Sequence, residues 1–164
     1  LKSLIPDGSE VMTGGSTTLD QIGFTDFLKS GRHSWKNLKQ VILDEKDPVK
    51  QIELRNKSTS SDYFIGSVHA ITKDGQVLIA SASGSQLPAY AFSSPQVIWI
   101  AGTQKIVSDF NLGIKRIEEY CFPLEDQRMK NIGYPGSSLN KILVIRKEFS
   151  KRITLILVKE VLGF

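Results

Sequence analysis

Residues 97–101, Val-Ile-Trp-Ile-Ala, are an unbroken apolar run that limits the possible folds more than any other feature of the sequence. The run is the length of one strand, and a strand without polar positions is buried on both faces. Such strands are typical of parallel sheets that carry helices above and below. Strand-like and helix-like segments also alternate along the rest of the chain. We therefore expect an α/β fold with a mostly parallel sheet and helices on both faces.

Turn and cap residues set the expected order of elements. The chain opens with a short strand at residues 10–13, a glycine turn and helical spacing over 17–29. We expect strands at 39–43, 63–72, 76–80, 141–145 and 152–159. Asp47 and Asp109 are expected to cap helices that run to about residue 57 and to about residue 120, where Pro123 ends the second one. Asp74-Gly75 predicts a hairpin, because glycine accepts a positive φ without steric cost.

The glycine turn is the strongest candidate site. In an open α/β sheet, ligands bind outside the carboxyl ends of the strands. Backbone N–H groups around Gly14 and Gly15 can approach a ligand, the following helix presents its positive end, and Ser16, Thr17 and Thr18 add hydroxyl groups. The segment matches neither the Walker A pattern nor the dinucleotide fingerprint. We interpret it as an anion-binding turn; the alternative is a tight turn in which Ser16 or Thr17 only caps the helix.

Two later segments also follow strands and are predicted to share the rim with this turn. The first is the small-residue loop of Ser83, Gly84 and Ser85; the second is Lys105, which follows the apolar run. A lysine at the mouth of a buried strand can supply a full positive charge to a phosphate or carboxylate. A solvated loop lysine is the equal alternative. His69 is interpreted as an alternating strand residue.

Composition excludes several classes of function. The net charge of +4 arises from lysines and arginines scattered among acidic residues, which favours an acidic ligand over direct nucleic-acid binding. No apolar run reaches the length of a membrane span. One cysteine, Cys121, allows neither an internal disulfide nor a thiolate-bound cluster and fits a cytoplasmic location. With His33 and His69 as the two histidines, we expect no metal site and no cofactor, and we expect Cys121 to be a buried, inert thiol.

Short motifs follow one another at residues 5–8, 11–19, 70–75, 104–109 and 162–164. As an ordered set they resemble the LUD domain, the lactate-utilisation family, over nearly the whole chain. The resemblance implies a fold like that of ribose-5-phosphate isomerase, glucosamine-6-phosphate deaminase and the CoA transferases. It also implies that the turn at residues 14–18 corresponds to the phosphate-holding turn of the isomerases. Residues 1–164 then form a single LUD-like domain that lacks an N-terminal helical segment.

The chain also departs from this family. Larger relatives carry cysteine-rich iron–sulfur segments, which this chain lacks, so it resembles the short, cluster-free type, the third component of bacterial lactate-oxidation systems. Gln104 stands where many members have Asn, and the nucleophilic glutamate of CoA transferases has no counterpart.

Three hypotheses for the function follow. The first is a non-redox component of lactate or related organic-acid utilisation that binds a small anionic metabolite, iron–sulfur partner subunits, or both. The second is an enzyme of the sugar-phosphate isomerase or transferase class. The third is a ligand-sensing module that acts through a partner, because no helix-turn-helix is present. The sequence leaves open whether the chain catalyses a reaction and whether it forms a homodimer.

Overall fold

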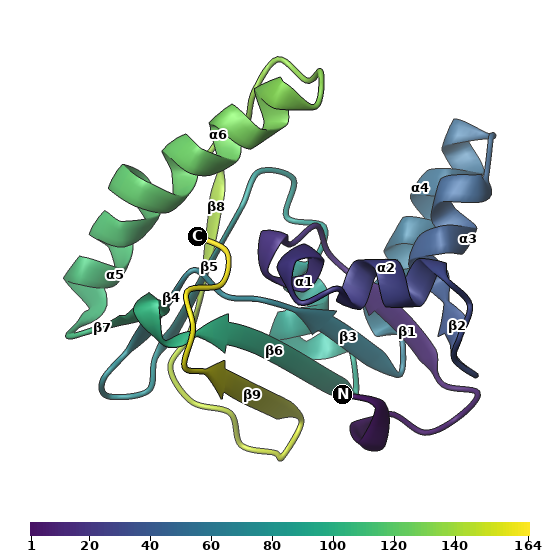
Figure 1. The fold of residues 1–164 in the computed structure, drawn as a ribbon, viewed down its shortest axis with the longest axis horizontal. Helices are drawn as coiled ribbons and strands as arrows, with labels where there is room; N and C mark the ends of the chain where they lie inside the picture. The colour runs from purple at the N-terminus through teal and green to yellow at the C-terminus, as the bar shows by residue number, and fades with distance from the viewer.

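A five-stranded sheet, all parallel, forms the centre of the computed structural model, which describes residues 1–164 (Figure 1). Its strands follow the order β2-β1-β3-β6-β9. The expected α/β architecture is therefore confirmed. The apolar run lies in β6, where neighbours on both sides pair with it. The bounds are β1 (Glu10–Thr13), β2 (Lys36–Asn37), β3 (Tyr63–Gly66), β6 (Gln96–Gly102) and β9 (Ile153–Val158).

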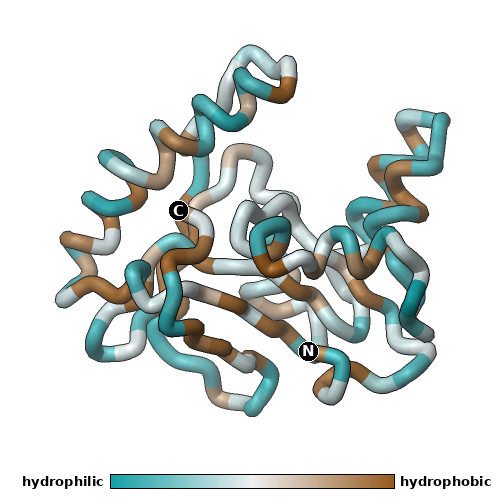
Figure 2. Tube along the Cα trace, viewed as in Figure 1, coloured by the Kyte–Doolittle hydropathy of each residue, from teal (hydrophilic) through white to brown (hydrophobic).

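Side chains of β6 alternate between two cores, which explains why the whole run is apolar. Val97 and Trp99 join one core together with Ile42, while Ile98 and Ile100 join another. The second core is closed by the helices α1 (Thr17–Gln21) and α2 (Phe24–Lys29), and the first by α3 (Leu38–Asp44), which leads into α4 (Pro48–Lys57). In Figure 2 the brown, hydrophobic stretches follow the strands, and the outer helices are mixed.

Residues 39–43 were expected to form a strand, and this prediction is wrong, because they lie in α3. The side chain of Asn37 accepts a hydrogen bond from the backbone N–H of Gln40 and so caps a helix directly after β2. Ile42 is buried while its neighbours Val41 and Leu43 are exposed. A run of five such residues fits either structure by its pattern alone.

A second, four-stranded sheet was not predicted. Its order is β7-β4-β5-β8, formed by β4 (Ala70–Thr72), β5 (Val77–Ser81), β7 (Ile106–Val107) and β8 (Lys141–Ile145). Residues 63–72 therefore form two strands, and the chain leaves the first sheet at Ser67. The hairpin at Asp74-Gly75 is confirmed by the antiparallel pairing of β4 with β5 and by the φ of +90° at Gly75. One face of this sheet packs on the first core through Ile71, and the other packs on Ile117.

A long helical rod, α5 (Phe110–Arg116) followed by α6 (Phe122–Asn131), covers the second sheet (Figure 1). Asp109 caps it as expected, accepting from the N–H of Leu112. Pro123, however, does not end the helix. A π-helical turn at residues 117–121 precedes it, and Pro123 takes a position in the first turn of α6, where proline is tolerated. None of the helices is long and apolar enough to cross a membrane.

Candidate functional site

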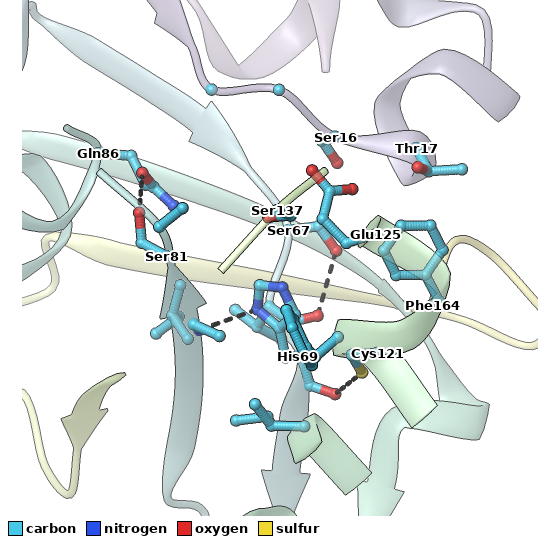
Figure 3. A pocket seen from close by; sticks show the side chains of 18 of the residues that line it. Ser16, Thr17, Ser67, His69, Ser81, Gln86, Cys121, Glu125, Ser137 and Phe164 are labelled. Atoms are coloured by element: carbon cyan, nitrogen blue, oxygen red, sulfur yellow. Dashed lines mark hydrogen bonds between the residues drawn. The ribbon is translucent and has the colours of Figure 1, made fainter. Parts of the chain in front are cut away.

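A pocket of about 240 Å³ opens where the loops after β1, β3 and β6 meet (Figure 3). The strand order places β2 on one side of β1 and β3 on the other, so the order reverses between β1 and β3. At such a reversal the connecting loops leave in opposite directions and open a crevice at the carboxyl ends of the strands. The pocket therefore lies at the edge where open α/β sheets commonly bind their ligands.

Lys105 lines the pocket and is almost completely buried, with 1% of its surface exposed. Its Nζ donates to Oγ1 of Thr18 at 3.1 Å and to Oγ of Ser67 at 3.0 Å. These contacts join the loops after β1, β3 and β6 through one ammonium group. Burial, together with the charge of Arg116, lowers the pKa of Lys105 to about 8. No carboxylate forms an ion pair with it.

The residues of the glycine turn, Gly14, Gly15, Ser16, Thr17 and Thr18, all line this pocket. The Ser16 hydroxyl accepts from the N–H of Leu19 at 3.3 Å, so it caps α1 as the alternative interpretation described. Thr17 differs, because its Oγ1 is buried without any hydrogen-bond partner. Gly15 does not have a positive φ, and a Cβ added there would meet no atom within 4 Å. The backbone conformation at Gly15 therefore does not itself require glycine.

The small-residue loop after β5 lines the pocket through Ser83 and Ser85. Gly84 does not line it. Its N–H donates to Oγ of Ser81 at 2.9 Å, and its φ of +83° shapes the turn. A Cβ at Gly84 would collide with the side chain of Lys141. The turn, this loop and Lys105 thus share one pocket, in which Gly84 acts through the backbone conformation of the loop.

His69 also faces the pocket, although the sequence suggested an ordinary strand position. It lies in the short break between β3 and β4, where the chain passes from one sheet to the other. Its Nδ1 accepts from the N–H of Ala80 at 3.1 Å, and its carbonyl accepts from Nε of Arg116 at 3.0 Å. Burial and the charges of Lys105 and Arg116 lower its pKa to about 4, so the ring is neutral at pH 7.

The rod of α5 and α6 contributes residues that sequence reasoning missed. Glu125 and Arg128 line the pocket and form a two-pronged pair, with both N–O distances at 2.7 Å. They lie one helical turn apart on α6, but nothing in the sequence indicated that α6 passes over the carboxyl ends of the strands. Cys121 lines the pocket too, and burial raises the pKa of its thiol.

The C-terminal segment, residues 162–164, packs against the residues that surround Lys105. The carbonyl of Leu162 accepts from Oγ1 of Thr18 at 3.3 Å and from Nε2 of Gln104 at 2.9 Å. Gly163 has a φ of +62°, and a Cβ there would collide with Oγ1 of Thr18. The motif at residues 162–164 therefore has a physical reason: only glycine lets this segment approach the lysine so closely.

No three His, Cys, Asp or Glu side chains gather as ligands of a metal ion would. The pocket can instead hold an anion. It offers one buried cation, a free hydroxyl at Thr17 and an uncharged imidazole.

Comparison with known proteins identifies one family. The sequence profile of the LUD domain matches residues 1–158. No curated protein sequence matches the chain. Solved structures that resemble it include a DUF162 family protein from Deinococcus radiodurans (8% identity, covering 92% of this chain and 87% of that one, TM-score 0.41). Others are eIF2B beta from Chaetomium thermophilum (15%, 67% and 38%, 0.38) and ribose 5 phosphate isomerase A from Neisseria gonorrhoeae (15%, 80% and 61%, 0.36).

Proposed function

This chain belongs to the LUD domain family, and from that premise we propose that it binds a small organic acid as the non-redox component of a lactate-utilisation system. Membership of the family suggests a role in lactate utilisation. The finer proposal is that the anion occupies the pocket around Lys105, and that residues 1–164 act as one domain in the cytoplasm. The glycine turn, Ser83 and Ser85 form the rest of its surroundings.

One observation carries this proposal: Lys105 is a buried ammonium with no carboxylate partner. Burying a charge is unfavourable unless it is paired. Two hydroxyl groups accept from this ammonium, but neither carries a negative charge. In the same pocket, the buried hydroxyl of Thr17 has no hydrogen-bond partner. A bound anion would balance the charge of Lys105, and its oxygens would accept a hydrogen bond from Thr17.

The volume and lining of the pocket limit the ligand to a small, polar molecule. Its volume of about 240 Å³ is below the ~300–1,000 Å³ usual for sites that hold drug-sized ligands. This favours a metabolite of a few carbon atoms over a nucleotide or CoA. Serine and threonine hydroxyls surround the cation, which favours a ligand that carries oxygen atoms.

Partner proteins must supply the electron transfer in this proposal. The chain has one cysteine, Cys121, and it is buried beside Lys105, so thiolates of this chain do not hold a cluster. We propose iron–sulfur subunits as partners, with a homodimer as the simpler alternative. Co-purification of the tagged chain with proteins encoded beside it tests the first. Light scattering of the isolated chain tests the second.

Binding is tested by thermal shift and calorimetry with L-lactate, D-lactate, pyruvate and ribose 5-phosphate, with lactamide as the uncharged control. A ligand present at 100 times its Kd stabilises the folded state by about 2.7 kcal/mol. We expect one of the acids, and not lactamide, to raise the melting temperature. The Lys105→Met variant should lose this response, whereas Lys147→Met, an exposed lysine, should keep it. Equal responses to acid and amide would refute the anion site.

A second candidate, an enzyme of the sugar-phosphate isomerase class, is favoured by Glu125. Proton transfer during isomerisation needs a carboxylate near the substrate, and Glu125 lines the same pocket as Lys105. Its pairing with Arg128 would have to loosen first. Interconversion of ribose and ribulose 5-phosphates by the wild type, lost in Glu125→Gln, would establish this function. Binding of a ligand without turnover would support the first proposal, a non-redox component that binds an organic acid, or a sensing role exerted through a partner.

A further inference from the structure

His69 has one ring nitrogen committed to the protein and one directed to the pocket. Nδ1 accepts from the backbone N–H of Ala80 at 3.1 Å. A backbone N–H can only donate, so Nδ1 carries no proton, and in the neutral ring the proton is on Nε2. Nε2 makes no hydrogen bond within the protein, and Figure 3 shows the imidazole inside the pocket beneath Ser67 and Glu125.

The position of this residue is fixed from both sides. The carbonyl of His69 accepts from Nε of Arg116 at 3.0 Å, and the thiol of Cys121 lies 4.0 Å from the same oxygen. These contacts hold the backbone of His69, and turning the ring would break the hydrogen bond from Ala80 of β5. A hydrogen-bond donor held in this way is preorganised, and its orientation does not have to be restricted again when a ligand binds.

Burial keeps this donor uncharged, and charged neighbours add to the effect. Burial lowers the pKa of the His69 ring, and the charges of Lys105 and Arg116 lower it further. Cys121, which also lines the pocket, is a buried thiol. The wall of the pocket therefore combines one cation with one neutral N–H donor, close together at the break after β3.

We propose that Nε2–H of His69 donates a hydrogen bond to an oxygen of the bound oxyanion whose charge is balanced by Lys105. The proposal rests on the anion site described above and names the chemistry of the ligand, a carboxylate or phosphate whose oxygens accept from both residues. His69 is then a binding residue that selects for acceptor oxygens and not a general base.

Two variants separate the structural hydrogen bond from the ligand contact. In His69→Asn, the amide oxygen can replace Nδ1 as the acceptor for Ala80, but no donor reaches the position of Nε2. In His69→Gln, the amide nitrogen can replace Nε2. With inorganic phosphate and L-lactate as probes, we expect binding of the responding probe to weaken about three- to tenfold in His69→Asn, as one uncharged hydrogen bond contributes. It should stay within about twofold of the wild type in His69→Gln.

Nitrogen NMR of the ¹⁵N-labelled wild type observes the His69 ring directly, and a variant is needed only to assign its signals. His69→Gln assigns the signals, because only His33 remains in that variant. We expect a neutral Nε2–H ring at pH 6.5 and at pH 8, and a change in the Nε2 shift when a probe binds. A proton on Nδ1, a charged ring at pH 6.5, or a probe that shifts the amide of Ser67 but leaves Nε2 unmoved would overturn the role of His69 alone. If neither probe binds, the anion site falls, and this proposal falls with it.

Discussion

Replacing Lys105 by Met should stabilise the ligand-free protein while it abolishes anion binding. Lys105 has a pKa of about 8 in place of 10.5, chiefly because it is buried. One pKa unit corresponds to ~1.4 kcal/mol, so at pH 7 the folded state holds this ammonium at a cost of about 3 kcal/mol relative to the unfolded chain. Methionine has a similar length and carries no charge. It therefore removes this cost.

The substitution also removes two hydrogen bonds, which offsets part of the gain. The hydroxyls of Thr18 and Ser67 accept from Lys105 and lose this donor, while the hydrogen bond that Thr18 donates to Ser67 at 3.1 Å remains. The loss of the two hydrogen bonds from Lys105 is worth about 1–2 kcal/mol. The net expectation at pH 7 is a variant more stable by about 1–2 kcal/mol, which raises the melting temperature by roughly 2–8 °C for a chain of this size.

The pH dependence of the difference identifies its origin. A lysine whose folded pKa is lowered adds stability above its unfolded pKa, and this stability is lost as the pH falls towards the folded value. The free energy of unfolding of the wild type should therefore rise by about 3 kcal/mol relative to that of Lys105→Met as the pH rises from about 8 to 10.5. The advantage of the variant should disappear within this range, and the wild type should be the more stable protein above it. Urea denaturation at pH 7, 8.5 and 10 in buffers without phosphate or carboxylate measures this, with Lys147→Met as the exposed control, expected within about 0.5 kcal/mol of wild type. A variant that is less stable than wild type at pH 7 would show that the lysine is already compensated by the protein, and the argument for a missing anion would fail.

Four other outcomes follow from the same contacts. Anion affinity, measured by calorimetry, should fall as the pH rises through about 8, because Lys105 loses its charge there; an unchanged affinity at pH 9.5 would exclude the lysine as the main charge partner. Gly15→Val should abolish binding with little change in melting temperature, because an added Cβ meets open space at an ordinary φ; retained affinity would mean that the turn only caps α1. Ser16→Ala should lower stability by about 1 kcal/mol through loss of the cap, as chemical denaturation would report, and should weaken binding far less than Gly15→Val does. Gly163→Ala should destabilise the protein by about 1–3 kcal/mol, because its positive φ and the contact with the Thr18 hydroxyl both exclude a Cβ; a neutral result would show that the C-terminal segment does not support the lysine.

Local signals in the sequence were sufficient for much of the framework. The apolar run at residues 97–101 required a strand buried on both faces, and the structure places it in β6 with a core on each side. The caps at Asp47 and Asp109 and the hairpin at Gly75 depend on hydrogen bonds and φ values within a few residues. Because parallel strands end at one edge, the sequence was sufficient to predict that the turn after β1 and the lysine after β6 share a rim.

The tertiary structure alone decided what surrounds the lysine. His69 enters the pocket because the chain changes sheets after β3, and Glu125 enters it because a π-helical turn lets the rod continue past Pro123. Neither event has a local signal, since each depends on which distant segments pack together. The burial of Lys105 likewise depends on Gly163, which is 58 residues away in the sequence (163 − 105) and lies against Thr18 in space. A sequence can place a lysine at the end of a strand, but its charge, its pKa and its need for a partner are set by the side chains that exclude water from it.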